Sequence, residues 1–156
     1  MVKTGILPDA DFIQKVTLTD NDSGRFEDRW VKLQVPQDDL HPARKIWLKG
    51  LPATIQLPVA HGEGKFFAED KILNKLNDAN QTALHYVESH ENGSYPGNPN
   101  GSLENIAGIT DTSGKVFGLM PHPERCFHRH HYPFWQEKEE VPFGRMILQN
   151  AINYFK

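Results

Sequence analysis

The sequence contains a single cysteine, Cys126, among its 156 residues. One thiol cannot form an internal disulfide, which excludes the disulfide framework of small secreted proteins. One thiol also excludes a zinc deaminase, because that signature adds Pro-Cys-x-x-Cys to its His-x-Glu motif. The His-x-Glu motif itself is present, at His122 and Glu124, and needs another explanation.

Excess positive charge and long apolar runs are also absent. The formal net charge is −3, with 17 Lys and Arg against 20 Asp and Glu, so the basic surface of a nucleic-acid or anionic-membrane binder is not expected. No apolar run is long enough for a signal peptide or a transmembrane helix. We therefore expect a cytoplasmic protein with neither nucleic acid nor membrane as a partner, folded as a single domain over residues 1–156.

The hydrophobic pattern predicts alternating strands and helices, and hence an α/β or α+β fold. Strands are predicted at residues 31–35, 55–60, 83–87, 106–109 and 116–120, the last two joined as a hairpin by a glycine turn. Helices are predicted at residues 72–76 and 147–155. The second helix should be amphipathic and pack on the sheet.

Residues 1–8 have the composition of a helix end. Gly5 follows Met1 to Thr4, and Pro8 comes three positions after Gly5. A glycine cap with a proline shortly beyond it is typical of a helix C-terminus.

The segment LMPHPERC, residues 119–126, places His122 between two prolines. Pro121 and Pro123 favour extended conformations in the residues before them, so we expect the preceding strand to continue through the motif. Side chains two positions apart in a strand point the same way, about 6.6 Å apart at Cβ. Glu124 could then bind the near nitrogen of His122 and leave the other to take a proton from a nucleophile. A surface turn with an incidental ion pair is the alternative.

The same segment is rich in possible metal ligands. These are Cys126, His122, His128, His130 and His131. They crowd into ten residues without the paired spacing of zinc folds, so a solvated histidine-rich loop is favoured and no metal is expected. Cys126 is also a poor nucleophile, because in an extended chain it would have to fold back past Glu124 to reach His122.

Four motifs occur in order along the chain. They are SGRF at 23–26, LPVAHGEGKF at 57–66, YPGNPNGS at 95–102 with NIAGI at 105–109, and GLMPHPER at 118–125. Together they closely resemble the glutaminase subunits of phosphoribosylformylglycinamidine synthases, a family of class I glutamine amidotransferases in purine biosynthesis. The similarity continues through residues 144–155 and covers nearly the whole chain.

The resemblance implies a flavodoxin-like α/β fold, with His122 at the position of the catalytic base and Glu124 at that of its orienting carboxylate. In the family a cysteine attacks the glutamine amide, ammonia leaves, and water clears the glutamyl thioester. The ammonia passes to a larger synthetase subunit that binds ATP and magnesium. No cofactor is therefore expected in this chain, and its expected partners are glutamine and the synthetase.

Two further segments match positions near the family's active-site cleft. His61, Gly62 and Glu63 are expected to line it, although a plain turn at the end of a strand is the alternative. Asn98 and Asn100 are expected in a rigid loop beside the site, with ordinary turn chemistry as the alternative.

The family's nucleophile stands in a Gly-x-Cys-Asn-Gly turn that enters a helix, and the end of that helix resembles residues 1–5. We therefore expect the nucleophile elbow, the first strands and part of the oxyanion hole to lie upstream of Met1. Without them the sheet should have an open edge and an uncovered apolar face, and the chain should be poorly stable and inactive with glutamine. A non-catalytic module that binds the synthetase is the alternative.

Overall fold

A computed structural model describes residues 1–87, 97–133, 135–137 and 141–156. Its strands are β1 (Val16–Thr19), β2 (Glu27–Gln34), β3 (Thr54–His61), β4 (Lys65–Ala68), β5 (Thr82–Tyr86), β6 (Ile106–Thr110) and β7 (Phe117–Leu119). Its α-helices are α1 (Pro42–Lys45), α2 (Asp70–Asp78) and α3 (Phe143–Phe155), and its 3₁₀ turns are η1 (Leu103–Asn105), η2 (Pro123–Cys126) and η3 (Arg129–His131). Within these ranges no helix is both long and apolar enough to cross a membrane.

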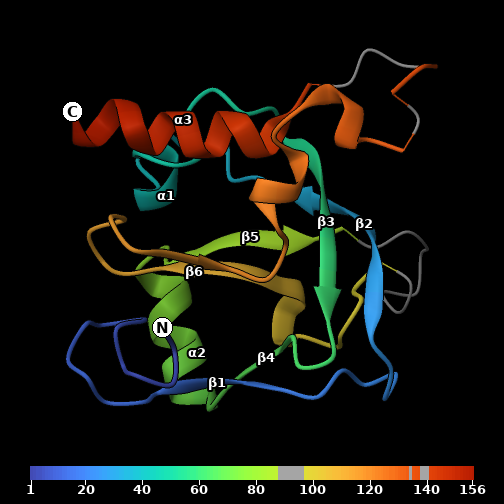
Figure 1. Ribbon diagram of the computed structural model, residues 1–156. Coiled ribbons are helices and arrows are strands. Elements are labelled where there is room, and N and C mark those ends of the chain that lie inside the picture. The colour runs from blue at the N-terminus through green and yellow to red at the C-terminus, as the bar shows by residue number, and fades with distance from the viewer. Residues whose placement is uncertain (88–96, 134, 138–140) are drawn as a thin grey trace.

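The strands form two antiparallel sheets. The larger has the order β3-β2-β5-β6-β7, and the smaller pairs β1 with β4. In Figure 1, α1 and α3 lie on one side of the β5–β6 part of the large sheet, while α2, β1 and β4 lie on the other. The arrangement confirms the mixed α/β class expected from the hydrophobic pattern.

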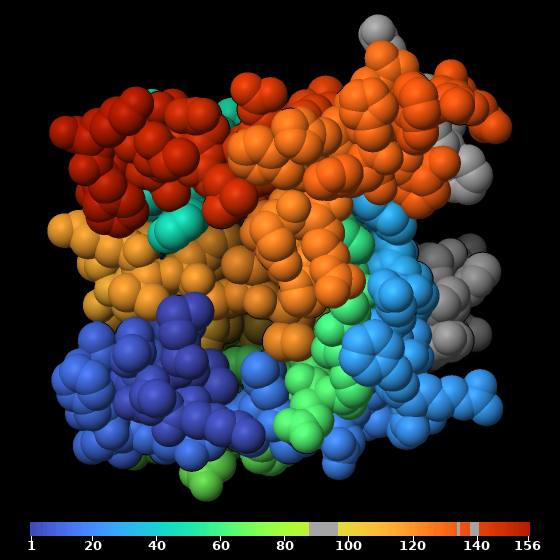
Figure 2. All heavy atoms as spheres, in the orientation of Figure 1, coloured from blue at the N-terminus to red at the C-terminus, as the bar shows by residue number. Residues whose placement is uncertain are grey.

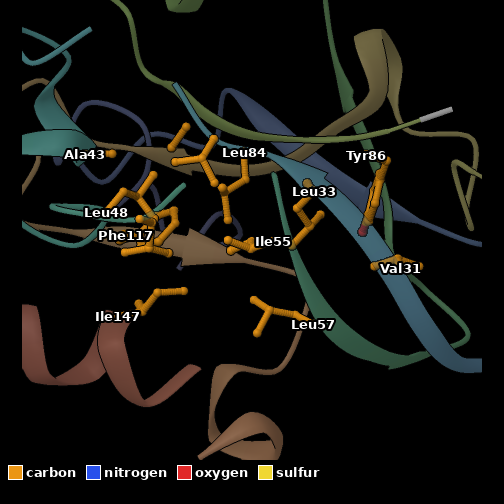
Figure 3. Close-up of a cluster of buried hydrophobic side chains, with 14 of the residues drawn as sticks. Val31, Leu33, Ala43, Leu48, Ile55, Leu57, Leu84, Tyr86, Phe117 and Ile147 are labelled. Atoms are coloured by element: carbon orange, nitrogen blue, oxygen red, sulfur yellow. The ribbon is translucent and has the colours of Figure 1, made fainter. Parts of the chain in front are cut away.

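The larger hydrophobic core lies between the large sheet and the α1–α3 side. Figure 3 shows Leu33, Leu57 and Leu84 from three strands and Ile147 from α3 in this cluster. All four are 0–1% exposed, and burying each such side chain contributes roughly 1.5–3 kcal/mol. Packing in this core fixes the position of β3, the strand beside which the candidate site lies.

A second core fills the opposite side of the sheet. It contains Leu7, Phe66 and Leu76 together with Ile106 and Ile109 of β6. All five residues of β6 are buried, because this strand has a core on each of its faces.

The predicted elements are confirmed, with ends that shift by a residue or more. The hairpin between β6 and β7 closes through Gly114, which has a φ of 73°. Of the C-terminal helix, Ile147 and Ala151 are buried, but Ile152 and Phe155 are 52% and 57% exposed. The short strands β1 and β4 were not predicted, since four residues each carry too little pattern.

Residues 1–6 adopt the predicted helix-end geometry. The N–H of Ile6 donates to the carbonyl of Met1 at 3.2 Å, and the N–H of Gly5 donates to that of Val2 at 3.1 Å. Gly5 has a φ of 66°. These two bonds and the left-handed glycine define the Schellman motif that ends helices.

The expectation that the chain stays extended through the His122 motif is wrong beyond His122. His122 is extended, with φ −100° and ψ 91°, but Pro123 begins the 3₁₀ turn η2. Proline has the φ that the first residue of a helical turn needs and lacks the N–H that would be unpaired there. Pro123 therefore ends the extended segment and starts the turn.

Candidate functional site

His122 and Glu124 meet across the first residues of η2. His122 Nδ1 and Glu124 Oε1 are 2.6 Å apart, and the two side chains are 30% and 60% exposed. The contact at the near nitrogen was predicted, although the turn produces it and not an extended chain. His122 Nε2 takes no part in this bond, so it is available to exchange a proton.

The pKa of the Glu124 carboxyl reflects this contact. Partial burial works to raise this pKa, but the hydrogen bond from His122, the backbone N–H of Glu124 and the nearby charges outweigh burial. The pKa therefore lies below its usual value of 4.5. Glu124 is an anion at neutral pH and suits the role of orienting the imidazole.

Strand β3 holds the backbone of the motif in place. The N–H of His122 donates to the carbonyl of Pro58 at 2.8 Å. In Figure 2 the orange segment that follows β7 lies on the visible face, between red α3 and the blue N-terminal segment. The histidine is thus anchored through its backbone while its side chain stays near the surface.

Helix α3 packs closely on η2 at Gly144. A Cβ at this position would lie 1.9 Å from the carbonyl oxygen of Pro123 and 2.8 Å from that of Cys126. Only glycine allows this approach. Gly144 therefore helps to position the turn that carries Glu124, a role that its place at the start of a helix did not indicate.

Cys126 ends η2 and points into the larger core, where it is 4% exposed. The predicted extended geometry for this residue is therefore wrong, because η2 turns it inward. Burial among apolar side chains disfavours a thiolate, which supports the view that Cys126 is not the nucleophile.

The residues predicted to lie near a cleft differ in their exposure to solvent. His61, Asn98 and Asn100 are buried, at 5%, 9% and 1% exposure. Glu63 is exposed and Gly62 half-buried. Of the five, only Glu63 and Gly62 are thus accessible to solvent, and the other three are enclosed; Tyr95 and Pro96, which open the third motif, are outside the described residues.

The asparagine loop is closed by its own side chains. Asn98 Oδ1 accepts from the N–H of Gly101 at 2.9 Å, and Asn98 Nδ2 donates to the carbonyl of Ser102 at 3.0 Å. Asn100 Oδ1 accepts from the hydroxyl of Ser102 at 2.7 Å. Such bonds match the turn chemistry considered for this loop.

Sequence reasoning missed three polar residues of this region. Asn21, Ser102 and Tyr86 are buried beside His61 and Asn100. Burial raises the pKa of Tyr86, although a hydrogen bond from Asn100 opposes the shift. Asn21 lies two residues before the SGRF motif, and this proximity was the available signal.

The pKa of the buried His61 imidazole lies below its usual value of 6.5. Burial is the main cause that lowers the pKa of His61 below 6.5, and the charges of His122 and Arg29 act in the same direction. A hydrogen bond and Glu27 oppose them. His61 ends β3, the same strand whose Pro58 carbonyl accepts the N–H of His122.

The histidine-rich loop shows ring contacts. His128 lies edge-on to His131, and His130 lies edge-on to Trp135, with centroids 5.4 Å and 4.8 Å apart. Among the described residues, no group of three or more His, Cys, Asp or Glu side chains is arranged to hold a metal ion.

An apolar cavity of about 130 Å³ lies beside β6 and β7. Its lining includes Leu7, Phe66, Gly118 and Met120, and Met120 lies two positions before His122. In the described part of the chain β7 pairs with β6 alone. An edge of the sheet, within the described residues, and an apolar hollow thus lie next to the motif.

Comparison with known families gives a match over almost the whole chain. The profile of the CobB/CobQ-like glutamine amidotransferase domain matches residues 1–155.

Several curated proteins named phosphoribosylformylglycinamidine synthase subunit PurQ are similar. The protein from Dehalococcoides mccartyi is 42% identical over 99% of this chain and 59% of its own length. That from Treponema denticola is 39% identical over 99% and 62%, and that from Methanococcus maripaludis is 35% identical over 96% and 58%. The chain thus spans 58 to 62% of the length of these relatives.

A solved structure supports the same fold. A chain in the structure of PurLQS from Thermotoga maritima is 31% identical, with a TM-score of 0.64 over 97% of this chain and 55% of that chain. These matches confirm the resemblance inferred from the four motifs and the glutamine amidotransferase fold that it implied.

Proposed function

The chain belongs to the CobB/CobQ-like glutamine amidotransferase domain family, and we propose that it is the part of a glutaminase that carries the general base and its orienting carboxylate. The observation that carries this proposal is the 2.6 Å contact between His122 Nδ1 and Glu124 Oε1. The contact leaves His122 Nε2 for the reaction. Similarity to PurQ subunits supports glutamine as the substrate.

The proposed reaction moves one proton through His122. Nε2 takes the proton of a cysteine thiol, and the thiolate attacks the amide carbon of glutamine. The imidazolium then returns the proton to the leaving nitrogen, so that ammonia departs and a glutamyl thioester remains. Water, deprotonated by the same nitrogen, then attacks the thioester carbon, and the imidazolium returns this proton to the departing sulfur, which releases glutamate and restores the cysteine thiol. Glu124 holds the Nδ1–H tautomer and stabilises the imidazolium.

The nucleophile in this proposal comes from a segment outside these 156 residues. Cys126 is the single cysteine here and is buried in the core. The apolar cavity beside β7 ends at Met120 and offers a surface on which such a segment could place its thiol close to His122.

We further propose that the ammonia is consumed by a synthetase partner. The related proteins are named as subunits of phosphoribosylformylglycinamidine synthase. ATP and magnesium would then be bound by that partner, and this chain would need no cofactor of its own.

Ammonia release from glutamine tests the proposal. The chain is purified alone and also together with the part of the Dehalococcoides mccartyi relative that its alignment does not cover. We expect no release from the chain alone and release from the combination. His122→Ala should abolish the release, and Cys126→Ala should leave it intact.

Three outcomes would contradict parts of the proposal. Release by the chain alone would refute an external nucleophile. Loss of release on Cys126→Ala would make Cys126 the nucleophile. Binding to a synthetase without any release by the combination would support the alternative of a non-catalytic interaction module.

A further inference from the structure

We propose that His61 is a positioning residue, fixed as the neutral Nδ1–H tautomer by Asn21 and Asn100. His61 joins three segments at the end of β3 and thereby stabilises the position of Pro58, whose carbonyl accepts the N–H of His122. Its catalytic consequence rests on the proposed function of His122. The tautomer and the joining of the loops do not depend on that function.

Asn21 determines which nitrogen of His61 carries the proton. Asn21 Nδ2 donates to the carbonyls of Arg25 and His61, both at 2.8 Å. These two acceptors fix the orientation of the amide, so Oδ1 must face His61 Nδ1, 2.9 Å away. An amide oxygen can only accept a hydrogen bond, so His61 Nδ1 must carry the proton. Asn21 Oδ1 also accepts from the N–H of Gly64 at 3.2 Å.

Asn100 determines the state of the other nitrogen. Asn100 Oδ1 accepts from the N–H of Ser102 at 3.0 Å, and Asn100 Nδ2 donates to the carbonyl of Gly64 at 2.8 Å. The NH₂ group therefore faces both His61 Nε2, at 3.4 Å, and the hydroxyl of Tyr86, at 3.3 Å. A proton on Nε2 would meet another donor, so this nitrogen must be the acceptor and the ring must be neutral.

Close packing shields the ring from solvent and from small molecules. His61 is 5% exposed. A Cβ at Gly64 would lie 2.4 Å from His61 Nδ1, so only glycine leaves room for the ring. The role of His61 is therefore structural support of the cleft and not contact with substrate.

The bonds of His61 join three segments that are distant in the sequence. Asn21 precedes β2, His61 ends β3, and Asn100 lies in the loop before β6. The fully bonded cluster should be rigid. Pro58, whose carbonyl accepts the N–H of His122, is only three residues upstream on β3, about 10 Å away at strand rise. A shift of the strand end would therefore move the anchor of His122.

His41 provides an internal control with the opposite tautomer. The N–H of Ala43 donates to His41 Nδ1 at 3.2 Å, and His41 Nε2 lies 3.2 Å from the carbonyl of Thr82. Nδ1 is thus the acceptor and Nε2 carries the proton. The structure assigns opposite tautomers to two buried histidines in one chain.

Long-range ¹H–¹⁵N NMR spectra of the uniformly labelled 156-residue chain test the proposal. We expect His61 as Nδ1–H and His41 as Nε2–H, with both rings mostly neutral at pH 6.5 because burial lowers their pKa values. Asn21→Asp should place a carboxylate against Nδ1–H and raise the pKa of His61. His61 in the Nε2–H form, or mostly as the charged imidazolium at pH 6.5, would overturn the proposal even if no Asn21 variant folds.

Kinetics of the combined glutaminase supply a second readout. His61→Asn keeps an N–H group that can donate to Asn21 Oδ1, whereas His61→Leu has no such donor. His61→Leu should lower kcat by about 10 to 100-fold with KM unchanged, as expected for a misplaced base, and His61→Asn should recover part of the loss. A rise in KM alone would show direct substrate contact and contradict a positioning role. If no combination releases ammonia, the proposed function fails while the NMR result still stands.

Discussion

The two histidines at the ends of this site differ in the number of their partners. His122 uses one ring nitrogen in a contact with Glu124 and is 30% exposed at its side chain. His61 has a partner on both nitrogens and is 5% exposed. A histidine can exchange protons only if one nitrogen is accessible and its charged form is tolerated. The first residue therefore suits chemistry, and the second suits support.

Substitution at His122 should have the largest effect, and that effect should be on activity alone. In the combined glutaminase, His122→Ala should lower kcat by about 10²–10⁴-fold, the usual contribution of a general base. The free energy of unfolding should change by less than about 0.5 kcal/mol, since the side chain is partly exposed. Steady-state ammonia assays and urea unfolding measure the two quantities. A variant that keeps activity would remove His122 from the mechanism.

Substitution in the buried cluster should instead reduce stability. Asn100→Leu preserves size but leaves the N–H of Ser102 and the carbonyl of Gly64 without their partner. Each unpaired buried group costs roughly 1–3 kcal/mol, so the loss should be about 3 kcal/mol or more. Asn153→Leu makes the same change at an exposed position of α3. Asn153→Leu should shift the midpoint of urea unfolding only slightly. Equal losses of stability in the two variants would contradict the expected difference between the buried and the exposed position.

The pH dependence of stability should depend on the buried histidines. Burial lowers the pKa of His61 and of His41 below 6.5 in the folded chain. As the pH falls through 6.5 the unfolded chain takes up protons first, so the free energy of unfolding decreases until the lower folded pKa values are reached.

Carboxylates do not account for this loss above about pH 5. Asp9, Asp111 and Glu124 have pKa values below 3.8 or 4.5 when folded, and their contributions are lost only as the pH falls further. Urea unfolding at pH 7 and pH 5 should therefore show a smaller decrease for His61→Asn than for the unchanged chain. An equal decrease would mean that His61 is not held neutral.

The smallest expected effect is on the titration of Glu124. Its pKa lies below 4.5 because the bond from His122, with other contacts, outweighs the effect of burial. In His122→Ala this pKa should rise toward the ordinary value, and ¹³C NMR of the labelled carboxyl measures the change. An unchanged titration would show that the two side chains are not bonded in solution.

Local patterns were sufficient to predict most of the frame. The alternation of Val31 and Leu33, the apolar run before His61 and the glycine hairpin at Gly114 each indicated a strand or turn that the structure contains. The pairing of His122 with Glu124 was predicted too, because it depends on a spacing of two residues. The predicted geometry of that pairing was wrong, since Pro123 keeps only the preceding His122 extended and itself begins a turn.

The amino-acid sequence by itself determined the motifs, the class of the fold and the contact between His122 and Glu124, because these follow from interactions between residues close in the chain. Only the tertiary structure decided that His61 is enclosed. Its partners Asn21 and Asn100 are 40 and 39 positions away. No local rule specifies hydrogen bonds over such separations; they form when packing excludes water and each buried polar group must find a partner within the protein.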